Sequence, residues 1–160
     1  MRRYAAAVIT VSDSCANGTR EDGSGPALAQ LLETEFGSVQ QTLVVPDERA
    51  DITAALEQCE EAGARLIVTT GGTGIAERDV TPEATVRFCD KLLPGVAELM
   101  RAEGRAQTPT AALSRGVCGT KGRALVLNLP GSPAGAVASL RVVLPLIPHA
   151  LDLLDGKTAH

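Results

Sequence analysis

Thr69-Thr70-Gly71-Gly72-Thr73-Gly74 is the stretch of sequence on which both the fold and the site depend. It directly follows Arg65-Leu66-Ile67-Val68, a short run rich in branched apolar residues that predicts a buried β-strand. Three glycines within four residues remove side chains where a backbone turns sharply or approaches another group closely. Such a loop at the carboxyl end of a strand presents bare N–H groups, which suit phosphate or another anion. The alternative is that the glycines only make a tight turn between a strand and a helix.

The residues after the glycine loop add a carboxylate and a helix start. Asp79 lies seven residues after Gly72. Thr81-Pro82-Glu83 predicts a first helical turn, because threonine caps, proline suits the first position and glutamate suits the positive end of the helix dipole. A carboxylate beside an anion-binding loop indicates phosphoryl chemistry on a metal-bound nucleotide.

The composition predicts one domain over residues 1–160, long enough to bury a core. The formal charge is −4 with no run of Lys or Arg, so we expect no binding to nucleic acid, and an aromatic platform for single strands is missing. The apolar run after Met1-Arg2-Arg3-Tyr4 meets polar residues too soon for a signal sequence or a membrane span. We therefore expect a soluble, cytoplasmic protein that does not bind membranes.

The cysteines and histidines do not form a metal-binding pattern. The two histidines accompany four cysteines that are scattered without CxxC spacing: Cys15, Cys59, Cys89 and Cys118. We interpret the cysteines as free thiols in a reducing compartment rather than as zinc ligands. His149 lies in an apolar helical context, and we interpret it as structural.

Strand-like and helix-like segments alternate along the chain. Strands are expected at 5–11, 39–45 and 65–68, a hairpin from 111–117 and 123–129 around 119–122, and helices near 24–37, 50–63, 83–90, 94–104, 133–144 and 147–154. Strands that alternate with helices predict an α/β fold in three layers, with a mostly parallel central sheet, helices on both faces and a β-hairpin.

Four polar segments each follow a predicted strand. They are Ser12-Asp13-Ser14, Pro46-Asp47-Glu48, Thr70 to Gly74, and Asn128 to Pro133. In a parallel open sheet the carboxyl ends of the strands share one edge, and ligands bind there. We therefore expect the four segments to converge on one site. The polar loop 16–25 after the first segment is too long for a plain connection, which is typical of a functional or mobile loop.

The common nucleotide and hydrolase motifs are missing. No Gly-Lys-Ser/Thr follows a glycine loop, Gly72-Thr73-Gly74 lacks the third glycine of the dinucleotide fingerprint, and no GxSxG elbow occurs. What remains is the pair Asp47 and Asp79. The hydroxyls expected around them belong to Ser14, Thr73, Ser114 and Ser132.

Two carboxylates beside anion-binding amides suit Mg²⁺, which prefers one or two carboxylates together with phosphate oxygens. Asp47 and Asp79 are therefore the candidate magnesium ligands. The alternative is that Asp47 begins a turn and Asp79 helps to cap a helix.

Taken together, these motifs resemble the molybdopterin adenylyltransferase family of the MogA/MoaB type, which includes the N-terminal domain of gephyrin. The resemblance runs nearly end to end. It is carried by Thr69 to Gly74 with Arg78 to Thr85, and by Val11 to Ser14, Val45 to Glu48, Leu113-Ser114-Arg115, Asn128 to Ser132, and Pro148 to Leu154.

The resemblance implies a step in molybdenum cofactor biosynthesis. The terminal phosphate of molybdopterin would attack the α-phosphate of Mg-ATP, giving adenylylated molybdopterin and pyrophosphate. Asp47 and Asp79 would be the catalytic acidic residues, acting through Mg²⁺ and phosphate positioning. Substrate and nucleotide would be bound by Ser12, Asp13, Ser14, Thr70, Gly71, Gly72, Thr73, Gly74, Ser114, Asn128, Pro130, Gly131 and Ser132.

The resemblance further implies a single molybdopterin-binding domain that forms a homo-oligomer, a trimer or a hexamer. A second function stays open, because some relatives of the MoaB type are expected to bind the pterin without catalysing the transfer. In that case the protein would store molybdopterin or hand it over.

Overall fold

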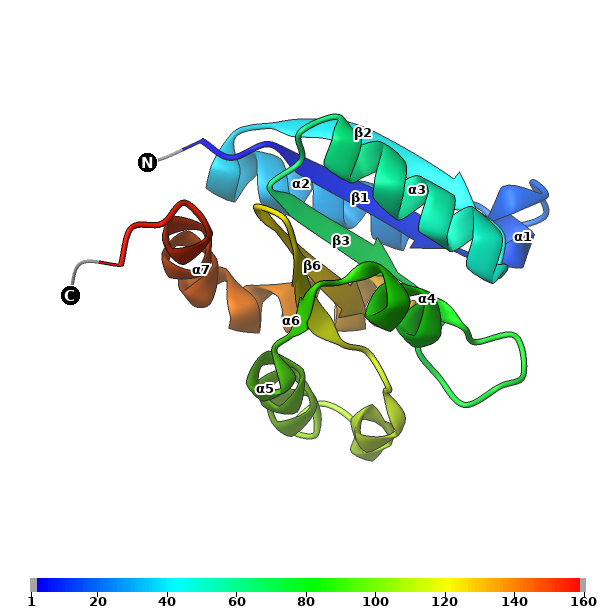
Figure 1. Cartoon of the computed structure of the whole chain (residues 1–160). Coiled ribbons are helices and arrows are strands. Elements are labelled where there is room, and N and C mark those ends of the chain that lie inside the picture. The colour runs from blue at the N-terminus through cyan, green and yellow to red at the C-terminus, as the bar shows by residue number, and fades with distance from the viewer. Residues whose placement is uncertain (1–2, 159–160) are drawn as a thin grey trace.

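The computed structural model describes residues 3–158, so the outermost residues of the expected domain, 1–2 and 159–160, lie outside the described part. One sheet lies between two layers of helices (Figure 1). Its strands are β1 (Ala6–Val11), β2 (Val39–Val45), β3 (Leu66–Thr70), β4 (Lys91–Leu92), β5 (Cys118–Lys121) and β6 (Ala124–Leu129). They are ordered β2-β1-β3-β6-β5-β4 across the sheet.

The sheet is parallel through its centre and antiparallel at one edge. β2, β1, β3 and β6 pair in parallel, whereas β5 pairs antiparallel with β6 and β4 with β5. Thr70 at the end of β3 lies beside Thr10 of β1 and Leu129 of β6. The carboxyl ends of the central strands therefore meet at one edge, and the expected mostly parallel α/β sheet is confirmed.

The helices cover both faces of the sheet. They are α1 (Asp13–Ala16), α2 (Ser24–Phe36), α3 (Arg49–Glu61), α4 (Thr81–Phe88), α5 (Pro94–Gly104), α6 (Pro133–Val143) and α7 (Ile147–Leu154), with 3₁₀ helices η1 (Pro109–Leu113) and η2 (Leu144–Leu146). In Figure 1, α3 and α4 lie in front of the sheet and α2 and α6 behind it. This is the three-layer arrangement that the alternating segments predict.

Alternation along the strands sends neighbouring side chains to opposite layers. Val8 and Val68 pack in the cluster with α2, α5, α6 and α7, whereas Ile9 and Ile67 pack with α3 and α4. All residues of β1, β3 and β6 are buried. Because both faces of these strands are covered, they appear in the sequence as continuous apolar runs.

The hairpin begins later than predicted. Residues 111–117 were expected to form its first strand, but Pro109 to Leu113 form η1 and the first strand is β5. Pro109 lacks an N–H and has a fixed φ, which suits the first turn of a helix rather than a strand. The hairpin turn is Gly122-Arg123, where Gly122 has a φ of 55° that suits a two-residue turn.

One local prediction about a helix start is wrong, and one helix was not predicted. Thr81 does not cap α4, because Val80 occupies the N-cap position and the Thr81 hydroxyl donates instead to the Gly71 carbonyl at 3.0 Å. Ser12 to Ser14 do not simply open a loop. Ser12 caps the short helix α1, and its Oγ accepts a hydrogen bond from the Cys15 N–H at 3.2 Å.

The helical stretch Pro133–Leu154 is long and apolar enough, by length and composition alone, to cross a membrane. Core helices of folded domains pass the same test, although 22% of the most apolar window is buried here. The 3₁₀ helix η2 separates α6 from α7 within this stretch, and α6 packs against α2 and α5. These contacts make the stretch part of the layer behind the sheet.

Candidate active site

A cavity of about 400 Å³ opens at the carboxyl ends of the parallel strands. We call it the polar cavity. Each of the four segments that were expected to converge contributes to its lining. These contributions are Ser12 after β1, Asp47 after β2, Thr70 to Gly72 at the end of β3, and Gly131 to Pro133 after β6. The edge of the sheet predicted from the strand order is therefore the place where the polar segments meet.

Two helices begin at the polar cavity. Gly23 and Ser24 at the start of α2, and Ser132 and Pro133 at the start of α6, all line it. The two starts are in close contact, since a Cβ on Gly23 would lie 3.1 Å from Pro133 Cγ. Helix N-termini carry a partial positive charge and N–H groups without intrahelical partners, although here the Gly25 N–H donates to Asp22 and the Gly135 N–H to Ser132. This wall of the cavity therefore suits an anion.

The glycine loop is shaped by close contacts with the protein itself. Gly71 has a φ of 100°, and a Cβ there would lie 2.3 Å from the Val11 carbonyl oxygen. Gly72 has a φ of 68°, and a Cβ there would lie 2.3 Å from Thr81 Oγ1 and 3.1 Å from Asp47 Oδ1. Both positions require glycine, because the backbone has a positive φ and because a Cβ would be too close to neighbouring atoms.

Some of the N–H groups that this loop was expected to offer to an anion already donate to the protein itself. The Gly71 N–H donates to the Leu129 carbonyl at 3.1 Å, which joins the loop to the end of β6. The Thr70 hydroxyl strengthens the same junction by donating to the Pro130 carbonyl at 2.6 Å. The N–H of Gly72, which lines the polar cavity, has no hydrogen-bond partner within residues 3–158. Gly72 is therefore the backbone donor that this loop offers to a ligand.

Asp47, which follows β2, is held by hydrogen bonds with Asp13, which follows β1. Its Oδ2 accepts from the Asp13 N–H at 2.9 Å, and its own N–H donates to Asp13 Oδ1 at 3.0 Å. Arg78 binds the same Asp13 carboxylate through Nε at 2.6 Å and reaches Glu48 through Nη2 at 2.9 Å. The side chain of Asp13, which we expected to bind substrate, is thus engaged within the protein, where it orients Asp47.

The polar cavity contains excess negative charge at Asp47. Burial raises the pKa of the Asp47 carboxyl above its ordinary value, and the nearby charges of Asp13 and Asp79 act in the same direction. The hydrogen bond from the Asp13 N–H and the charge of Arg78 act against this rise. A carboxylate that is partly buried near other carboxylates favours a bound cation.

Asp47 and Asp79 are the residues that could hold a Mg²⁺ ion together with a ligand. Both line the polar cavity. Within residues 3–158, no group of three or more His, Cys, Asp or Glu side chains is arranged to hold a metal ion. A cation at this place would therefore complete its coordination with phosphate oxygens and water, which is how Mg²⁺ binds beside one or two carboxylates.

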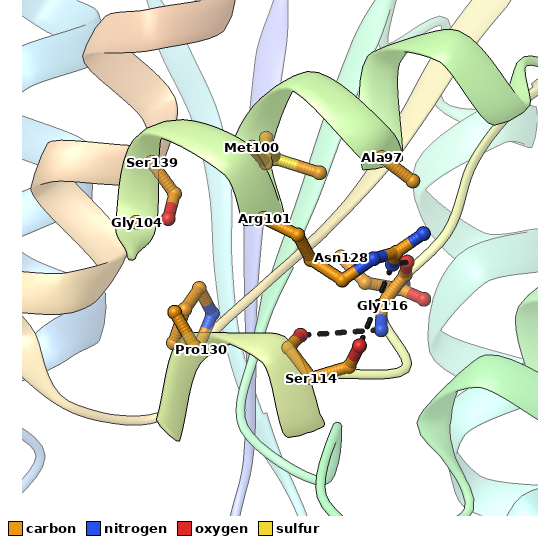
Figure 2. Close-up of a pocket in the computed structure, with 10 residues that line it drawn as sticks. Ala97, Met100, Arg101, Gly104, Ser114, Gly116, Asn128, Pro130 and Ser139 are labelled. Carbon is orange, nitrogen blue, oxygen red and sulfur yellow. Dashed lines mark hydrogen bonds between the residues drawn. The ribbon is translucent and has the colours of Figure 1, made fainter. Parts of the chain in front are cut away.

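The predicted residues Ser114 and Pro130 line a second cavity of about 200 Å³ between α5, η1 and α6, which we call the α5–α6 cavity. Ser132 lines both cavities. Figure 2 shows a small adjoining pocket, in which Arg101 reaches the Gly116 carbonyl at 3.1 Å and Ser114 Oγ accepts from the Gly116 N–H at 3.3 Å. Ser114 therefore lines the α5–α6 cavity and does not line the polar cavity with the two aspartates.

Asn128 lies in the core, and its side chain is fully engaged. Its amide nitrogen donates to the hydroxyls of Thr69 and Thr85, both at 2.9 Å, and its oxygen accepts from the Val117 N–H at 3.1 Å. These bonds tie β6 to β3, to α4 and to the segment before β5. Asn128 thus links these elements within the fold, and it also lines the small pocket shown in Figure 2.

The other predicted residues lie at the margins of the polar cavity. Ser14 is in α1, with its hydroxyl 3.2 Å from that of Ser12. Thr73 is buried, and its carbonyl accepts from the Arg115 N–H at 2.8 Å. Gly74 begins the loop that carries Asp79, and a Cβ there would lie 2.7 Å from Asp79 Oδ2.

The loop before α2 supplies lining residues that the sequence analysis did not single out. Asp22 accepts from the Thr10 hydroxyl at 2.7 Å and from the Gly25 N–H at 2.9 Å. These two bonds fix the loop beside the polar cavity, where Arg20 adds a positive charge to the lining. The sequence feature that pointed to this loop was its unusual length, over residues 16–25. Length indicated a functional segment, but not which of its residues line the cavity.

Parallel strands that end in polar loops, with two helix N-termini and paired carboxylates around one cavity, define an α/β protein with an anion site at the carboxyl edge of its sheet. Comparison with known proteins makes this class specific. The chain belongs to the family described as a probable molybdopterin binding domain, which matches residues 7–149.

Relatives of the chain cover nearly its whole length. A molybdopterin adenylyltransferase of Helicobacter pylori is 42% identical over 153 residues, which span 94% of this chain and 87% of the relative. The crystal structure of the molybdopterin biosynthesis enzyme MoaB from Thermus thermophilus is 48% identical, with a TM-score of 0.88 over 96% of this chain and 97% of that one. A tungsten cofactor synthesizing MoaB from Pyrococcus furiosus is 33% identical, with a TM-score of 0.88 over 96% of this chain and 98% of that one. The resemblance and the fold class predicted from the sequence are confirmed.

Proposed function

We propose that this protein is a molybdopterin adenylyltransferase, which transfers the adenylyl group of ATP to the terminal phosphate of molybdopterin and releases pyrophosphate. The observation that carries the proposal is the position of Asp47 and Asp79 in one cavity with the glycine loop and the starts of α2 and α6. The name and extent of the Helicobacter pylori relative support the same activity. Molybdopterin and ATP are then the substrates.

The polar cavity would hold the triphosphate of ATP. The N–H of Gly72 and the first turns of α2 and α6 provide donors and positive potential for phosphate oxygens. Mg²⁺, when bound by Asp47 and Asp79, would neutralise phosphate charge and stabilise the charge that develops on the leaving pyrophosphate. The protein's own contribution is to place these groups before the reaction begins.

The α5–α6 cavity would hold the pterin. Gln107, Thr108 and Thr110 supply polar groups to its lining, and Ser132 lies where it adjoins the polar cavity. A pterin phosphate near Ser132 would approach the α-phosphate of ATP from outside the triphosphate site. One of its oxygens forms the new bond to the α-phosphorus, and the bond from that phosphorus to the β-phosphate oxygen breaks.

No covalent enzyme intermediate and no general base are required in this scheme. The attacking phosphate oxygen is already ionised near neutral pH, and pyrophosphate leaves as an anion. Positioning and charge neutralisation therefore account for the catalysis, as they do in phosphoryl transfer generally. This agrees with a site lined by hydroxyls, carboxylates and the charge of Arg20, together with the Gly72 N–H.

We further propose that residues 1–160 act as one domain in the cytoplasm and assemble into a homo-oligomer, a trimer or a hexamer. Exposed apolar side chains support an oligomer, because a second copy would cover them. Ile75 is 72% exposed and Leu113, the last residue of η1, is 55% exposed. The bond from the Arg115 N–H to the Thr73 carbonyl joins the segments that carry them.

The alternative is a protein of the MoaB type that binds molybdopterin and hands it over without catalysis. Incubation with molybdopterin, Mg²⁺ and ATP labelled in the α-phosphate separates the two functions. An adenylyltransferase places the label on the pterin and releases unlabelled pyrophosphate. Pterin binding that is independent of ATP, with no label transferred, would favour the hand-over protein and overturn the proposal.

A further inference from the structure

Arg115 binds both ends of the loop that carries Asp79. Its Nε donates to the Gly74 carbonyl at 2.7 Å, and its Nη2 donates to the Asp79 carbonyl at 2.8 Å. Its backbone N–H also donates to the Thr73 carbonyl at 2.8 Å. One residue therefore closes the loop 74–79 and joins it to the segment that follows η1.

Among the described residues, the loop has one other link to the fold, the exposed ion pairs of Arg78 with Asp13 at 2.6 Å and with Glu48 at 2.9 Å. Inside it, the Ala76 N–H donates to Asp79 Oδ2 and the Asp79 N–H donates to the Ala76 carbonyl, both at 3.0 Å. These bonds orient the carboxylate relative to the loop, but they do not fix the loop to the fold. Residues 75–78 are exposed. Exposed ion pairs such as those of Arg78 contribute little, so the position of Asp79 at the polar cavity depends chiefly on the contacts at the loop ends.

Glu83 in the first turn of α4 orients the guanidinium of Arg115. The Arg115 Nη1 forms an ion pair with Glu83 Oε1, and this hydrogen bond lowers the pKa of the Glu83 carboxyl below its ordinary value. The second oxygen, Oε2, is buried without a hydrogen-bond partner in the described part of the chain. Its charge is therefore balanced chiefly by Arg115.

We propose that Arg115 is a positioning residue, which holds Asp79 at the polar cavity by binding both ends of the loop 74–79, with Glu83 as its anchor. The inference rests on the proposed function, because the placement of Asp79 sets a reaction rate only if Asp79 serves the transfer. A planar guanidinium is needed, since it bonds two carbonyls and a carboxylate at once. A lysine ammonium at the same place keeps the charge without this geometry.

Arg65 offers a matched control at the other end of β3. Its Nε donates to the Arg123 carbonyl at 2.8 Å, and its Nη2 contacts the Leu151 carbonyl at 3.4 Å and Asp155 Oδ1 at 2.9 Å. Like Arg115, it joins two carbonyls and one carboxylate, but it precedes the strand whose carboxyl end meets the cavity. Arg65→Lys therefore removes a similar set of bonds away from Asp79.

The test compares Arg115→Lys with Arg65→Lys in full-length protein by two measurements. The first is hydrogen exchange of the amides in residues 73–80, and the second is kcat for adenylyl transfer with the KM for each substrate. We expect Arg115→Lys to speed exchange in this segment and to lower kcat about 100-fold, as a displaced catalytic group does, with the KM for molybdopterin little changed. Arg65→Lys should leave both readouts at the native level.

Exchange in residues 73–80 that stays native in Arg115→Lys would overturn the inference, and a reduced rate alongside it would place Arg115 in contact with substrate instead. A similar loss in Arg65→Lys would also overturn it, because the effect would then be general. If Arg115→Lys does not fold, Glu83→Gln replaces it in the test. We then expect faster exchange in residues 73–80 and a lower kcat, both by less than for Arg115→Lys, and native values of both would overturn the inference. A native protein that transfers no label contradicts the proposed function, while the exchange measurement still decides whether Arg115 holds the loop.

Discussion

The backbone N–H of Asp13 donates to Asp47 Oδ2 at 2.9 Å, and the backbone N–H of Asp47 donates back to Asp13 Oδ1 at 3.0 Å. This reciprocal pair joins the segments that follow β1 and β2. It fixes the Asp47 carboxylate with Oδ1 close to Gly72, while Arg78 balances the charge of Asp13. The Asp47 carboxylate is therefore held at the polar cavity by contacts within the protein, at the place of the proposed Mg²⁺.

Asp47→Asn should abolish turnover without destabilising the protein at neutral pH. The folded-state pKa of Asp47 is raised, so its ionised form lowers the free energy of unfolding above that pKa. This cost vanishes as the pH falls below the ordinary carboxyl pKa, where Asp47 is protonated in both states. Asparagine still offers an oxygen to the Asp13 N–H. We expect urea denaturation to show Asp47→Asn at least as stable as the native protein at pH 7, with the difference shrinking toward pH 4; a variant clearly less stable at pH 7 would contradict this.

Gly72→Ala should destabilise the fold and weaken ATP binding. The new Cβ would lie 2.3 Å from Thr81 Oγ1 at a φ of 68°, and such strain costs about 1–3 kcal/mol. Gly63→Ala is the control, because Gly63 has a φ of 90° with no atom within 4 Å of the new Cβ. Thermal unfolding should rank Gly72→Ala below Gly63→Ala, and only Gly72→Ala should lose affinity for ATP. Equal effects of the two changes would show that the contact with Thr81 is irrelevant.

Cys15 should be the reactive thiol of the native protein. Burial raises the pKa of Cys59 and of Cys89 to about 11 and that of Cys118 to about 12, so these thiols stay protonated near neutral pH. Cys15 lines the polar cavity and is only half-buried. We expect a thiol reagent to modify Cys15 first, and Mg-ATP to slow that modification. Labelling that is insensitive to Mg-ATP would place the nucleotide elsewhere.

Asn128→Ala should lower stability while leaving ATP affinity intact. The change removes the partner of the Thr69 and Thr85 hydroxyls and of the Val117 N–H, and a buried polar group left unpaired costs about 1–3 kcal/mol. Chemical denaturation and calorimetric titration with ATP measure the two quantities separately. Lost affinity at native stability would instead mean that Asn128 contacts the nucleotide.

The sequence predicted the parallel part of the sheet and the edge where its polar segments meet, because both follow from local patterns, but it missed β4. Buried runs such as Ala6 to Val11 mark strands covered on both faces, and the polar residues after each strand mark the shared edge. The hairpin start was wrong because residues 111–117 have strand-like composition, whereas Pro109 favours a helical turn. The local pattern therefore gave the wrong element where a single residue, Pro109, determined the backbone conformation.

The supporting contacts of the site could not be predicted, because they join residues distant in sequence. Asp13 pairs with Asp47 and Arg78, and Arg115 closes a loop that begins at Gly74. Nothing in the local sequence shows that the Asn128 amide hydrogen-bonds to Thr69, Thr85 and Val117. The use of each polar side chain becomes clear only when its partners across the sheet are known.

The most direct test of the central claim is the rate of label transfer from α-labelled ATP to molybdopterin in the native protein, Asp79→Asn and Asp90→Asn. Asp90 is a matched control, because its carboxylate binds the Gly122 N–H in the hairpin and does not line the polar cavity. We predict transfer at the native rate in Asp90→Asn and a loss of about 100-fold or more in Asp79→Asn, with pterin binding retained. Transfer at the native rate in Asp79→Asn would contradict the assignment of the polar cavity as the active site.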